Sequence, residues 1–450
     1  MTRPPHPRDM RISPSRLQPT TIAIGGYKHA TVGLIALAIA LEQRVVLTNV
    51  PDIEDVKVLS EIIRQGHGVA HWDEGILTLD TRGFHPFDIP ESLSRRVHGV
   101  LYLLPVFLGR FKRVRLGESG GCPLDGSGSG PQRPVHHMLA VLERFGARFR
   151  LEDQEIQGET EGFTGCTIDC MAFSERSDLL TGPLVSGATK TAILAAACTR
   201  SGHTRIRNPY PKPDVTELLH LLAQAGFIVR REGRDLILIP PDGVSPRPPA
   251  LRHHVVSCLS EVITFIALSQ HCKVPLTLIE LTEERLRQGL AAEFALLDAM
   301  GIGLDWGKNV LRVTPAARIT SCDIEVTSVG IYSDHQPFFA LMLLDGDRPA
   351  RIREAVWKKR FSYARELSRL GADICLTEAG ITITPSALTR GGLTVVADDL
   401  RAAAVLVLAA LTAPGRTTVQ NVHHLERGYP NLLEVLINMG ACVDVNPKND

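Results

Sequence analysis

The segment richest in glycine surrounds a single cysteine. It runs Gly117-Glu-Ser-Gly-Gly-Cys-Pro-Leu-Asp-Gly-Ser-Gly-Ser-Gly-Pro-Gln-Arg133. Neither a helix nor a strand tolerates this composition, so we expect a long loop, and long loops in compact domains are usually functional or disordered. Cys122 has Arg115 and Arg133 nearby in the sequence, a setting that favours the reactive thiolate. The residues alone are equally compatible with an inert loop thiol.

Arginines at predicted helix starts form a second group with chemical potential. Arg360, Arg401 and Arg427 lie where backbone N–H groups already favour an anion. Together they suit a ligand that carries both phosphate and carboxylate, although each taken singly also fits a solvated surface arginine. Asp334, before the apolar run 338–344, is either a general base or a helix N-cap.

Motifs for metals and common nucleotide folds are weak or missing from the sequence. Cys166 and Cys170, and the pairs His136-His137, His253-His254 and His423-His424, lack the regular spacing of a structural zinc site. The glycine-rich loop has no G-K-[ST] ending, and no dinucleotide-binding fingerprint occurs. We therefore expect no metal and no cofactor.

Composition narrows the functional class. The 450 residues carry 49 Lys and Arg against 49 Asp and Glu, so no bulk charge attracts nucleic acid or an anionic membrane. The longest apolar stretch, 30–41, is too short to span a bilayer. Nine scattered cysteines indicate a reducing cytoplasm. Residues 1–18 lack the apolar region of a signal peptide, and we expect them to form a flexible tail.

The elements that position these residues recur along the chain. A helical stretch, a glycine just past its end and two short alternating strands occur six times, around Gly66, Gly146, Gly226, Gly301, Gly371 and Gly440. Each glycine is expected to take a positive φ at a helix C-terminus. A second helix and a short strand precede most copies, which predicts an α/β fold of six β-α-β-α-β-β units. The proline-rich segment 240–254 divides them into three and three.

These residues and repeats resemble the enolpyruvyl transferases, from about Ile22 to the C-terminus. The resemblance implies a two-domain inside-out α/β barrel with three units per domain and the active site in the cleft between the domains. Domain I would comprise 19–26 plus 250–450. Domain II, 27–249, would be inserted into it and would carry the mobile catalytic loop 117–133.

The resemblance also implies site residues. Lys28, in Gly25-Gly26-Tyr27-Lys28, matches a lysine that meets the phosphate of phosphoenolpyruvate. Cys122 matches the proton donor to the enolpyruvyl methylene, and Asp334 the aspartate that takes a proton from the acceptor hydroxyl. The residues implied to bind phosphoenolpyruvate are Lys28, Arg96, Arg133, Arg360, Arg401 and Arg427. Arg95 and Arg96 are both open choices for one of these positions.

The nucleotide side of the site is where this sequence departs from the family. The implied nucleotide-binding residues are Arg133, Pro134, Val135, His136, His137, Val185, Ser186, Gly187, His29 and Asp334. His29 replaces an asparagine that meets the acceptor, and His136 replaces an aspartate that contacts uracil. The loop after Cys122 is also longer than usual.

Three functions remain open on this basis. Because the departures fall on the acceptor side, we favour transfer to the 3'-hydroxyl of UMP, as in nikkomycin- and polyoxin-type nucleoside antibiotic pathways. Transfer to UDP-N-acetylglucosamine for peptidoglycan is the alternative. A catalytically inactive sensor of uridine nucleotides is an alternative of another class. The expected partners are therefore phosphoenolpyruvate and a uridine nucleotide.

Overall fold

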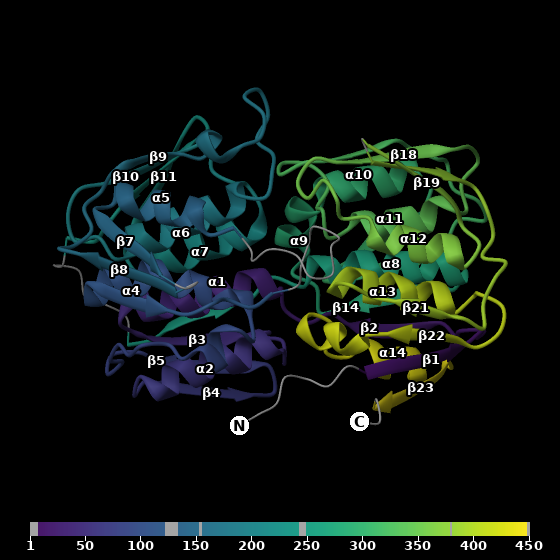
Figure 1. The fold of residues 1–450 in the computed structure, drawn as a ribbon, viewed down its shortest axis with the longest axis horizontal. Helices are drawn as coiled ribbons and strands as arrows, with labels where there is room; N and C mark the ends of the chain where they lie inside the picture. Colours follow the sequence, from purple (N-terminus) through teal and green to yellow (C-terminus); the bar gives the residue numbers. More distant parts are fainter. Residues whose placement is uncertain (1–7, 122–133, 153–154, 243–248, 379, 448–450) are drawn as a thin grey trace. The chain divides into compact units, whose positions relative to one another are not determined.

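The chain forms two compact units. The computed structural model describes residues 8–121, 134–152, 155–242, 249–378 and 380–447. Within these ranges, unit 1 comprises 8–25 and 257–447, and unit 2 comprises 26–121 and 134–256. Unit 2 is thus an insertion into unit 1, and each unit has its own helices and sheets (Figure 1).

One repeating plan accounts for the sheets. In unit 1, β2 (Thr20–Ala23) runs parallel to β14 (Leu276–Ile279), and the hairpin of β15 (Gly303–Gly307) and β16 (Val310–Thr314) completes the order β15-β16-β14-β2. Helices α8 (Leu259–Cys272), α9 (Glu283–Gly289) and α10 (Ala291–Ala299) connect these strands. This β-α-β-α-β-β arrangement is the predicted unit, and the predicted fold class is confirmed.

The other two sheets of unit 1 follow the same plan, in the orders β17-β18-β20-β19 and β21-β22-β1-β23. Their elements are β17 (Ile324–Val326), α11 (Gln336–Leu343), β18 (Ala350–Glu354), α12 (Ser362–Arg369), β19 (Asp373–Thr377), β20 (Gly380–Thr384), β21 (Thr394–Val396), α13 (Leu400–Ala410), β22 (Thr417–Gln420), η3 (Val422–Arg427), α14 (Leu432–Asn438), β23 (Cys442–Pro447) and β1 (Arg8–Ser13). Helices α8, α11 and α13 contact one another and are buried along their length. Apolar residues all round a helix favour this central place.

Unit 2 repeats this design with the sheets β13-β3-β5-β4, β6-β8-β7 and β11-β12-β10-β9. Its elements are α1 (Lys28–Leu41), β3 (Arg44–Thr48), α2 (Glu54–Gln65), β4 (Val69–Asp73), β5 (Ile76–Asp80), α3 (Glu91–Ser94), η1 (His98–Tyr102), α4 (Leu103–Phe111), β6 (Arg113–Leu116), α5 (His136–Arg144), β7 (Ala147–Glu152), β8 (Glu155–Thr160), β9 (Thr167–Asp169), η2 (Cys170–Phe173), α6 (Val185–Ala197), β10 (Thr204–Arg207), α7 (Pro213–Gln224), β11 (Ile228–Glu232), β12 (Asp235–Ile239) and β13 (Leu251–His254). Helices α1, α4 and α6 contact one another in its centre. In the three-stranded sheet, an isolated parallel bridge between Ile89 and Leu116 stands where the other sheets have a first strand.

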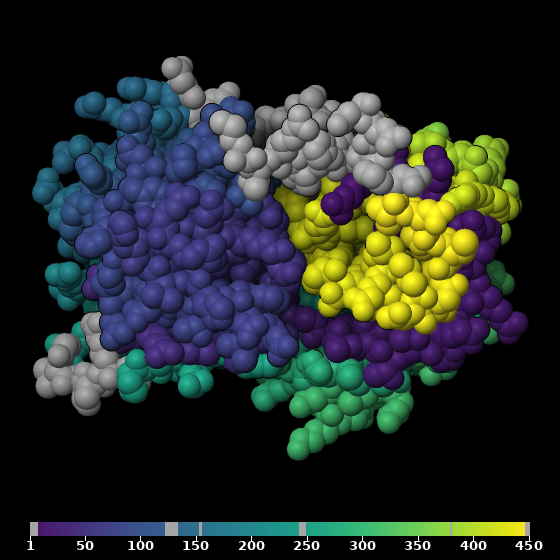
Figure 2. All heavy atoms as spheres, turned by 90° about the horizontal axis from the view of Figure 1, so that it is seen from below, coloured from purple at the N-terminus to yellow at the C-terminus, as the bar shows by residue number. Residues whose placement is uncertain are grey.

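The flexible tail expected over residues 1–18 is wrong for the residues described there. Strand β1 lies between β22 and β23, antiparallel to both, with Met10 opposite Val419 and Val445. Met10 and Ile12 are buried while Arg11 is exposed, the alternation of a strand with one covered face. Figure 2 shows the first and last residues of unit 1 side by side on its surface. Both partner strands lie at the far end of the sequence, so no local pattern predicts the pairing.

The boundary expected at residue 250 also needs correction. Strand β13 runs parallel to β3, with Leu251 opposite Val45, and therefore completes a sheet of unit 2. Unit 1 resumes at Ser257. The prolines before β13 interrupt the chain, but they do not mark the end of the inserted unit.

Five of the six repeat glycines have the expected positive φ, from 82° at Gly301 to 106° at Gly371. Gly66 does not: its φ is −79°, and His67 takes the left-handed conformation instead. A Cβ at Gly66 would lie 2.2 Å from Cε2 of Phe84, so close packing rather than backbone conformation requires glycine there. No helix in the described part of the chain is long and apolar enough to cross a membrane.

The place of β1 leads to a stability prediction. Replacing Ile12 with Ala should lower the unfolding free energy by about 2–5 kcal/mol, because it leaves a cavity beneath a central strand. The matched change on the exposed side of the same strand, Arg11→Ala, should cost less than about 0.5 kcal/mol. Urea unfolding of both variants tests this, and two equally small effects would contradict the structural role of β1.

Candidate active site

Asp334 lies between two buried arginines in unit 1. Nη1 of Arg360 donates to Oδ1 of Asp334 at 2.5 Å, and Nη2 of Arg401 donates to Oδ2 at 2.8 Å. The arginine side chains are 6% and 4% exposed, whereas that of Asp334 is 25% exposed. Both carboxylate oxygens therefore accept charge-assisted hydrogen bonds at a place that solvent reaches.

Asp399 fixes the backbone that carries one of these arginines. Its Oδ1 accepts hydrogen bonds from the backbone N–H groups of Arg401 (2.8 Å) and Ala402 (2.7 Å), so it is the N-cap of α13. Its Oδ2 accepts from Nε of Arg360 at 3.1 Å. The cap thus ties both arginines together, and Asp334 and Asp399 balance their two charges.

Two further hydrogen bonds hold the Arg401 guanidinium. Nη1 donates to the hydroxyl of Tyr429 at 2.7 Å, and Nη2 donates to Oγ of Ser260 at 2.9 Å. Burial lowers the pKa of Arg401, but Tyr429 and Asp334 outweigh this effect, so the pKa is raised and the group stays cationic. Burial raises the pKa of Tyr429 to about 12, which keeps its hydroxyl protonated.

A buried carboxyl of unit 1 lies one residue from Ser260. Oε2 of Glu261 accepts from the backbone N–H of Gly25 at 3.2 Å. Burial raises the pKa of Glu261 to about 7, more than the hydrogen bond from Gly25 and the charge of Arg401 lower it. This group can therefore hold a proton near neutral pH.

In unit 2, the first turn of α2 brings two cations together. Nζ of Lys28 donates to Oδ2 of Asp55 at 2.7 Å, and Arg96 pairs with the neighbouring Glu54 at 2.6 Å and with Glu61 at 3.1 Å. Adjacent acidic residues of one helix thus hold both side chains. A ligand that replaces these carboxylates could bind to the cluster through an anionic group.

The sequence profile of EPSP synthase (3-phosphoshikimate 1-carboxyvinyltransferase) matches residues 13–436.

The chain belongs to the EPSP synthase family.

Its relatives within this family include UDP-N-acetylglucosamine carboxyvinyltransferases. UDP-N-acetylglucosamine 1-carboxyvinyltransferase 2 of Listeria monocytogenes is 29% identical over 424 residues, which cover 94% of both chains. The Streptococcus pneumoniae enzyme of that name is 30% identical over 426 residues, 94% of this chain and 95% of the relative. The predicted class, a carboxyvinyl transferase, is confirmed.

Two solved structures of the family are also similar. The enolpyruvyl transferase NikO from Streptomyces tendae superposes with a TM-score of 0.90 at 34% identity, covering 99% of this chain and 100% of that one. EPSP synthase from Acinetobacter baumannii has a TM-score of 0.70 at 16% identity, covering 98% of this chain and 100% of that one. The second likeness is evidence for the fold alone.

The structure distinguishes the two arginines that the sequence left open. Arg96 shares the acidic turn of α2 with Lys28, whereas Arg95 pairs with Glu91 (2.6 Å) and Glu118 (2.7 Å) and is 58% exposed. Arg96 therefore remains the candidate ligand among these two family positions. Arg427 lies at the end of η3 rather than at a helix start, because the helix after it begins only at Leu432.

The residues expected on the nucleotide side divide by burial. His29, Pro134, Val135, His136, Ser186 and Gly187 are partly or fully accessible. Val185 is fully buried at the start of α6, so its side chain contributes to the core. His137 is also buried, and a Cβ on Gly187 would lie 2.1 Å from its Nε2. This close approach requires glycine at position 187.

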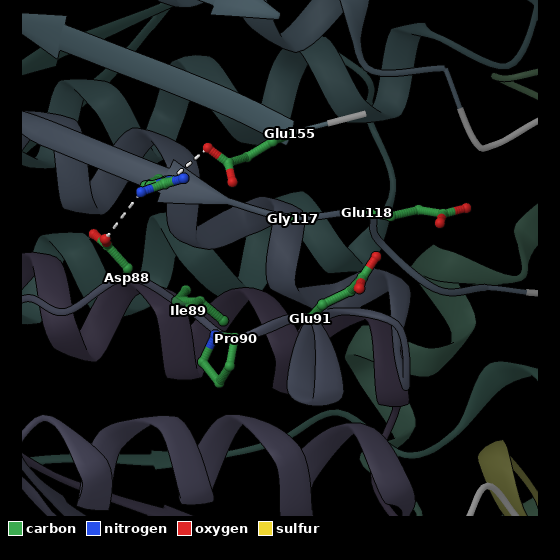
Figure 3. A pocket seen from close by; sticks show the side chains of 8 residues that line it. Asp88, Ile89, Pro90, Glu91, Gly117, Glu118 and Glu155 are labelled. Carbon is green, nitrogen blue, oxygen red and sulfur yellow. Dashed lines mark hydrogen bonds and ion pairs between the residues drawn. The ribbon is translucent and has the colours of Figure 1, made fainter. Parts of the chain in front are cut away.

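Cys122 and Arg133, the two expected loop residues, lie outside the described residues. A cavity of about 350 Å³ adjoins the start of that loop at Gly117 (Figure 3). Its lining includes four carboxylates, Asp88, Glu91, Glu118 and Glu155, with Arg115 paired to Glu155 at 2.5 Å. Because acidic groups dominate, this cavity does not suit phosphoenolpyruvate. Among the described residues, no group of three or more His, Cys, Asp or Glu is placed to hold a metal ion.

Several polar residues around the site were not predicted. Lys190, in the otherwise small and apolar α6, pairs with Asp214 at 2.7 Å, and its Nζ lies 4.8 Å from the ring centre of Tyr102. Both charged side chains are only 4% exposed. A lysine inside an alanine-rich helix is the one sequence signal that could have found this pair, since lysine is rarely buried without a partner.

His137 generates a pH prediction. Burial, followed by His136 and Lys190, lowers its pKa to about 4. In the unfolded chain this histidine has an ordinary pKa near 6.5, so below that pH it binds a proton that the folded chain does not bind. The unfolding free energy should therefore fall by about 3 kcal/mol between pH 6.5 and 4 through this group.

Urea unfolding at several pH values tests this with two variants. His137→Gln should flatten the pH dependence of the unfolding free energy over this window. Leu139→Ala, a buried change on the same helix, should lower stability at every pH and leave the dependence unchanged. An equal pH dependence in His137→Gln and the unmodified chain would contradict the lowered pKa.

Proposed function

We propose that this protein transfers the enolpyruvyl group of phosphoenolpyruvate to the 3'-hydroxyl of UMP and releases phosphate. The observation that carries enolpyruvyl transfer is the Asp334 carboxylate held by Arg360 and Arg401. It combines a base with two cations that can hold phosphate and carboxylate. The choice of acceptor rests on the greater identity to NikO, 34% against 28–30% for the UDP-N-acetylglucosamine enzymes.

The proposed reaction is an addition followed by an elimination. Asp334 takes the proton of the acceptor hydroxyl. The hydroxyl oxygen of the acceptor then attacks C2 of phosphoenolpyruvate while the thiol of Cys122 protonates C3. The product of this step is a tetrahedral ketal. Phosphate then leaves from C2 as the Cys122 thiolate takes a proton from C3, which restores the vinyl group on the acceptor and the thiol of Cys122.

The ion pairs within each unit suggest how substrate binding prepares the base. Arg360 and Arg401 now donate hydrogen bonds to Asp334. In the complex they would donate these hydrogen bonds to the anionic groups of phosphoenolpyruvate instead. The oxygens of Asp334 then become available to the acceptor hydroxyl. Lys28 would exchange Asp55 for a ligand oxygen in the same way. Arg96, Arg133 and Arg427 are the other arginines that we assign to anionic groups of the substrate.

The acceptor side differs from a sugar-nucleotide site in chemical character. His29 and His136 offer imidazoles where the family resemblance implies an amide and a carboxylate, and the neutral His137 lies beside Gly187. These changes favour an acceptor with a different polar pattern. UDP-N-acetylglucosamine stays the second candidate, because the curated relatives that match along 94% of the chain act on it by name. An inactive nucleotide sensor would not require Asp334.

The acceptor is tested by phosphate release from phosphoenolpyruvate with UMP and with UDP-N-acetylglucosamine in parallel, with products checked by mass. We expect turnover with UMP and a UMP product heavier by one enolpyruvyl group. Turnover only with the sugar nucleotide would contradict the proposed acceptor. Nucleotide binding without turnover of either would favour the sensor.

The role of Asp334 is tested by Asp334→Asn. Loss of the base should reduce kcat by about 10²–10⁴-fold. Phosphoenolpyruvate binding should not weaken, since a carboxylate that competes for both arginines is removed. Asp323→Asn is the control: this exposed aspartate accepts a backbone N–H of Arg351 in the same unit, and its loss should leave kcat unchanged. An unaltered kcat in Asp334→Asn would contradict the assignment.

A further inference from the structure

A chain of three buried side chains stands behind Arg401. Oε1 of Glu293, on α10, lies 2.9 Å from Nδ1 of His335, which directly precedes α11. Nε2 of His335 lies 3.2 Å from Oγ of Ser260, on α8. Ser260 in turn accepts from Nη2 of Arg401 at 2.9 Å. All three residues are 0% exposed, so none can contact a ligand.

The contacts determine where each proton lies. Oε1 of Glu293 also accepts the backbone N–H of Tyr332 at 2.8 Å, so it acts as an acceptor toward His335. His335 then carries its proton on Nδ1, and Nε2 accepts the hydroxyl proton of Ser260. With that proton turned toward His335, a lone pair of Ser260 faces Arg401. Burial lowers the pKa of His335 and favours this neutral tautomer.

We propose that Glu293, His335 and Ser260 are positioning residues that orient Arg401 for the anion of phosphoenolpyruvate. This inference rests on the proposed function. Nη2 of Arg401 makes two hydrogen bonds, one to Ser260 and one to Asp334. A ligand that replaces Asp334 can take over the second bond, while the first keeps the guanidinium plane in place. Without the hydrogen bond to His335, the Ser260 hydroxyl is free to rotate and loses its fixed direction.

Energetics favour a positioning role over simple core filling. Burying a carboxyl, an imidazole and a hydroxyl costs desolvation, and apolar residues of similar size often stabilise a core equally well. A buried hydrogen-bond network instead restricts its members to one geometry. Here the network ends on Arg401, which donates to the partly exposed carboxylate of Asp334, so the geometry it fixes is that of the proposed anion site.

The experiment compares two serines of the same helix. Ser260→Ala removes the hydroxyl that faces Arg401. Ser269→Ala removes an equally buried hydroxyl that donates to the carbonyl of Val274 at 2.6 Å, away from Arg401. Ser260→Ala loses two buried hydrogen bonds and Ser269→Ala loses one, so both melting temperatures should fall, that of Ser260→Ala by more. Only Ser260→Ala should raise the Kd and KM for phosphoenolpyruvate, by about tenfold, with kcat changed less than about threefold.

Two further variants separate positioning from packing. Ser260→Thr keeps the hydroxyl and should restore the Kd for phosphoenolpyruvate to within about twofold of the unmodified chain. His335→Ala should weaken binding as Ser260→Ala does, and the double variant should be no weaker than either single one, because both break the same path. These effects are read from binding to folded protein, so reduced stability does not obscure them.

The outcomes are distinguishable from failure of the proposed function. Equal Kd values for phosphoenolpyruvate in Ser260→Ala and Ser269→Ala, or additive effects in the double variant, would overturn the positioning role. Unmodified protein that binds phosphoenolpyruvate but releases no phosphate with either nucleotide would contradict the proposed function, while the serine comparison would still test Arg401. Unmodified protein that does not bind phosphoenolpyruvate would overturn both.

Discussion

The pairing of Arg360 and Arg401 with Asp334 and Asp399 is the interaction on which the rest of unit 1 depends. Two guanidinium groups that are 6% and 4% exposed would be very costly to bury without partner charges. Asp399, the N-cap of α13, supplies one partner charge in the core. Asp334 supplies the other on the side that solvent reaches. Each unpaired cation would destabilise the unit, and each paired one is a place where an external anion can bind.

The threefold repeat explains why these groups meet. The central helices α8, α11 and α13 occupy equivalent positions in successive repeats, and each contributes polar residues at or just before its N-terminus: Ser260 and Glu261, Asp334 and His335, Asp399 and Arg401. Helix N-termini favour anions, so three of them in one place suit a ligand with two acidic groups. Unit 2 uses the same device, with Lys28 opening α1 and Ser186 and Gly187 in the first turn of α6.

Local patterns in the sequence predicted the repeat well, and topology explains what they missed. The helix-glycine-hairpin pattern recurs because each unit must end one helix and reverse direction, and five of the six glycines have the positive φ that this turn needs. Strands β1 and β13 were misassigned because their partners, β22 and β3, belong to distant parts of the chain. Whether a short alternating segment is a strand depends on a partner that periodicity cannot identify.

The sequence indicated the charged residues that the structure brings together around Asp334, but not the residues that hold them in place. Arg360 and Arg401 lie in motifs that match the family. Arg95 and Arg96 are adjacent in the sequence, and only the folded structure shows that Arg96, not Arg95, pairs with α2. Ser260, Glu293 and Lys190 lie on helices rich in apolar residues, where no motif singles them out.

Three of the candidate cations are already paired with carboxylates in the structure, and this constrains how the proposed reaction can proceed. Lys28 is paired with Asp55, and Arg360 and Arg401 are paired with Asp334. The affinity for an anionic substrate is therefore the difference between new ion pairs and those that it breaks, which keeps binding moderate even in a strongly cationic site. Because one of the displaced carboxylates is the proposed base, binding of the anion and release of the base are a single event. A base that is available only when the anion is bound cannot act on the acceptor alone, so proton transfer from the acceptor waits for the anion whichever substrate binds first.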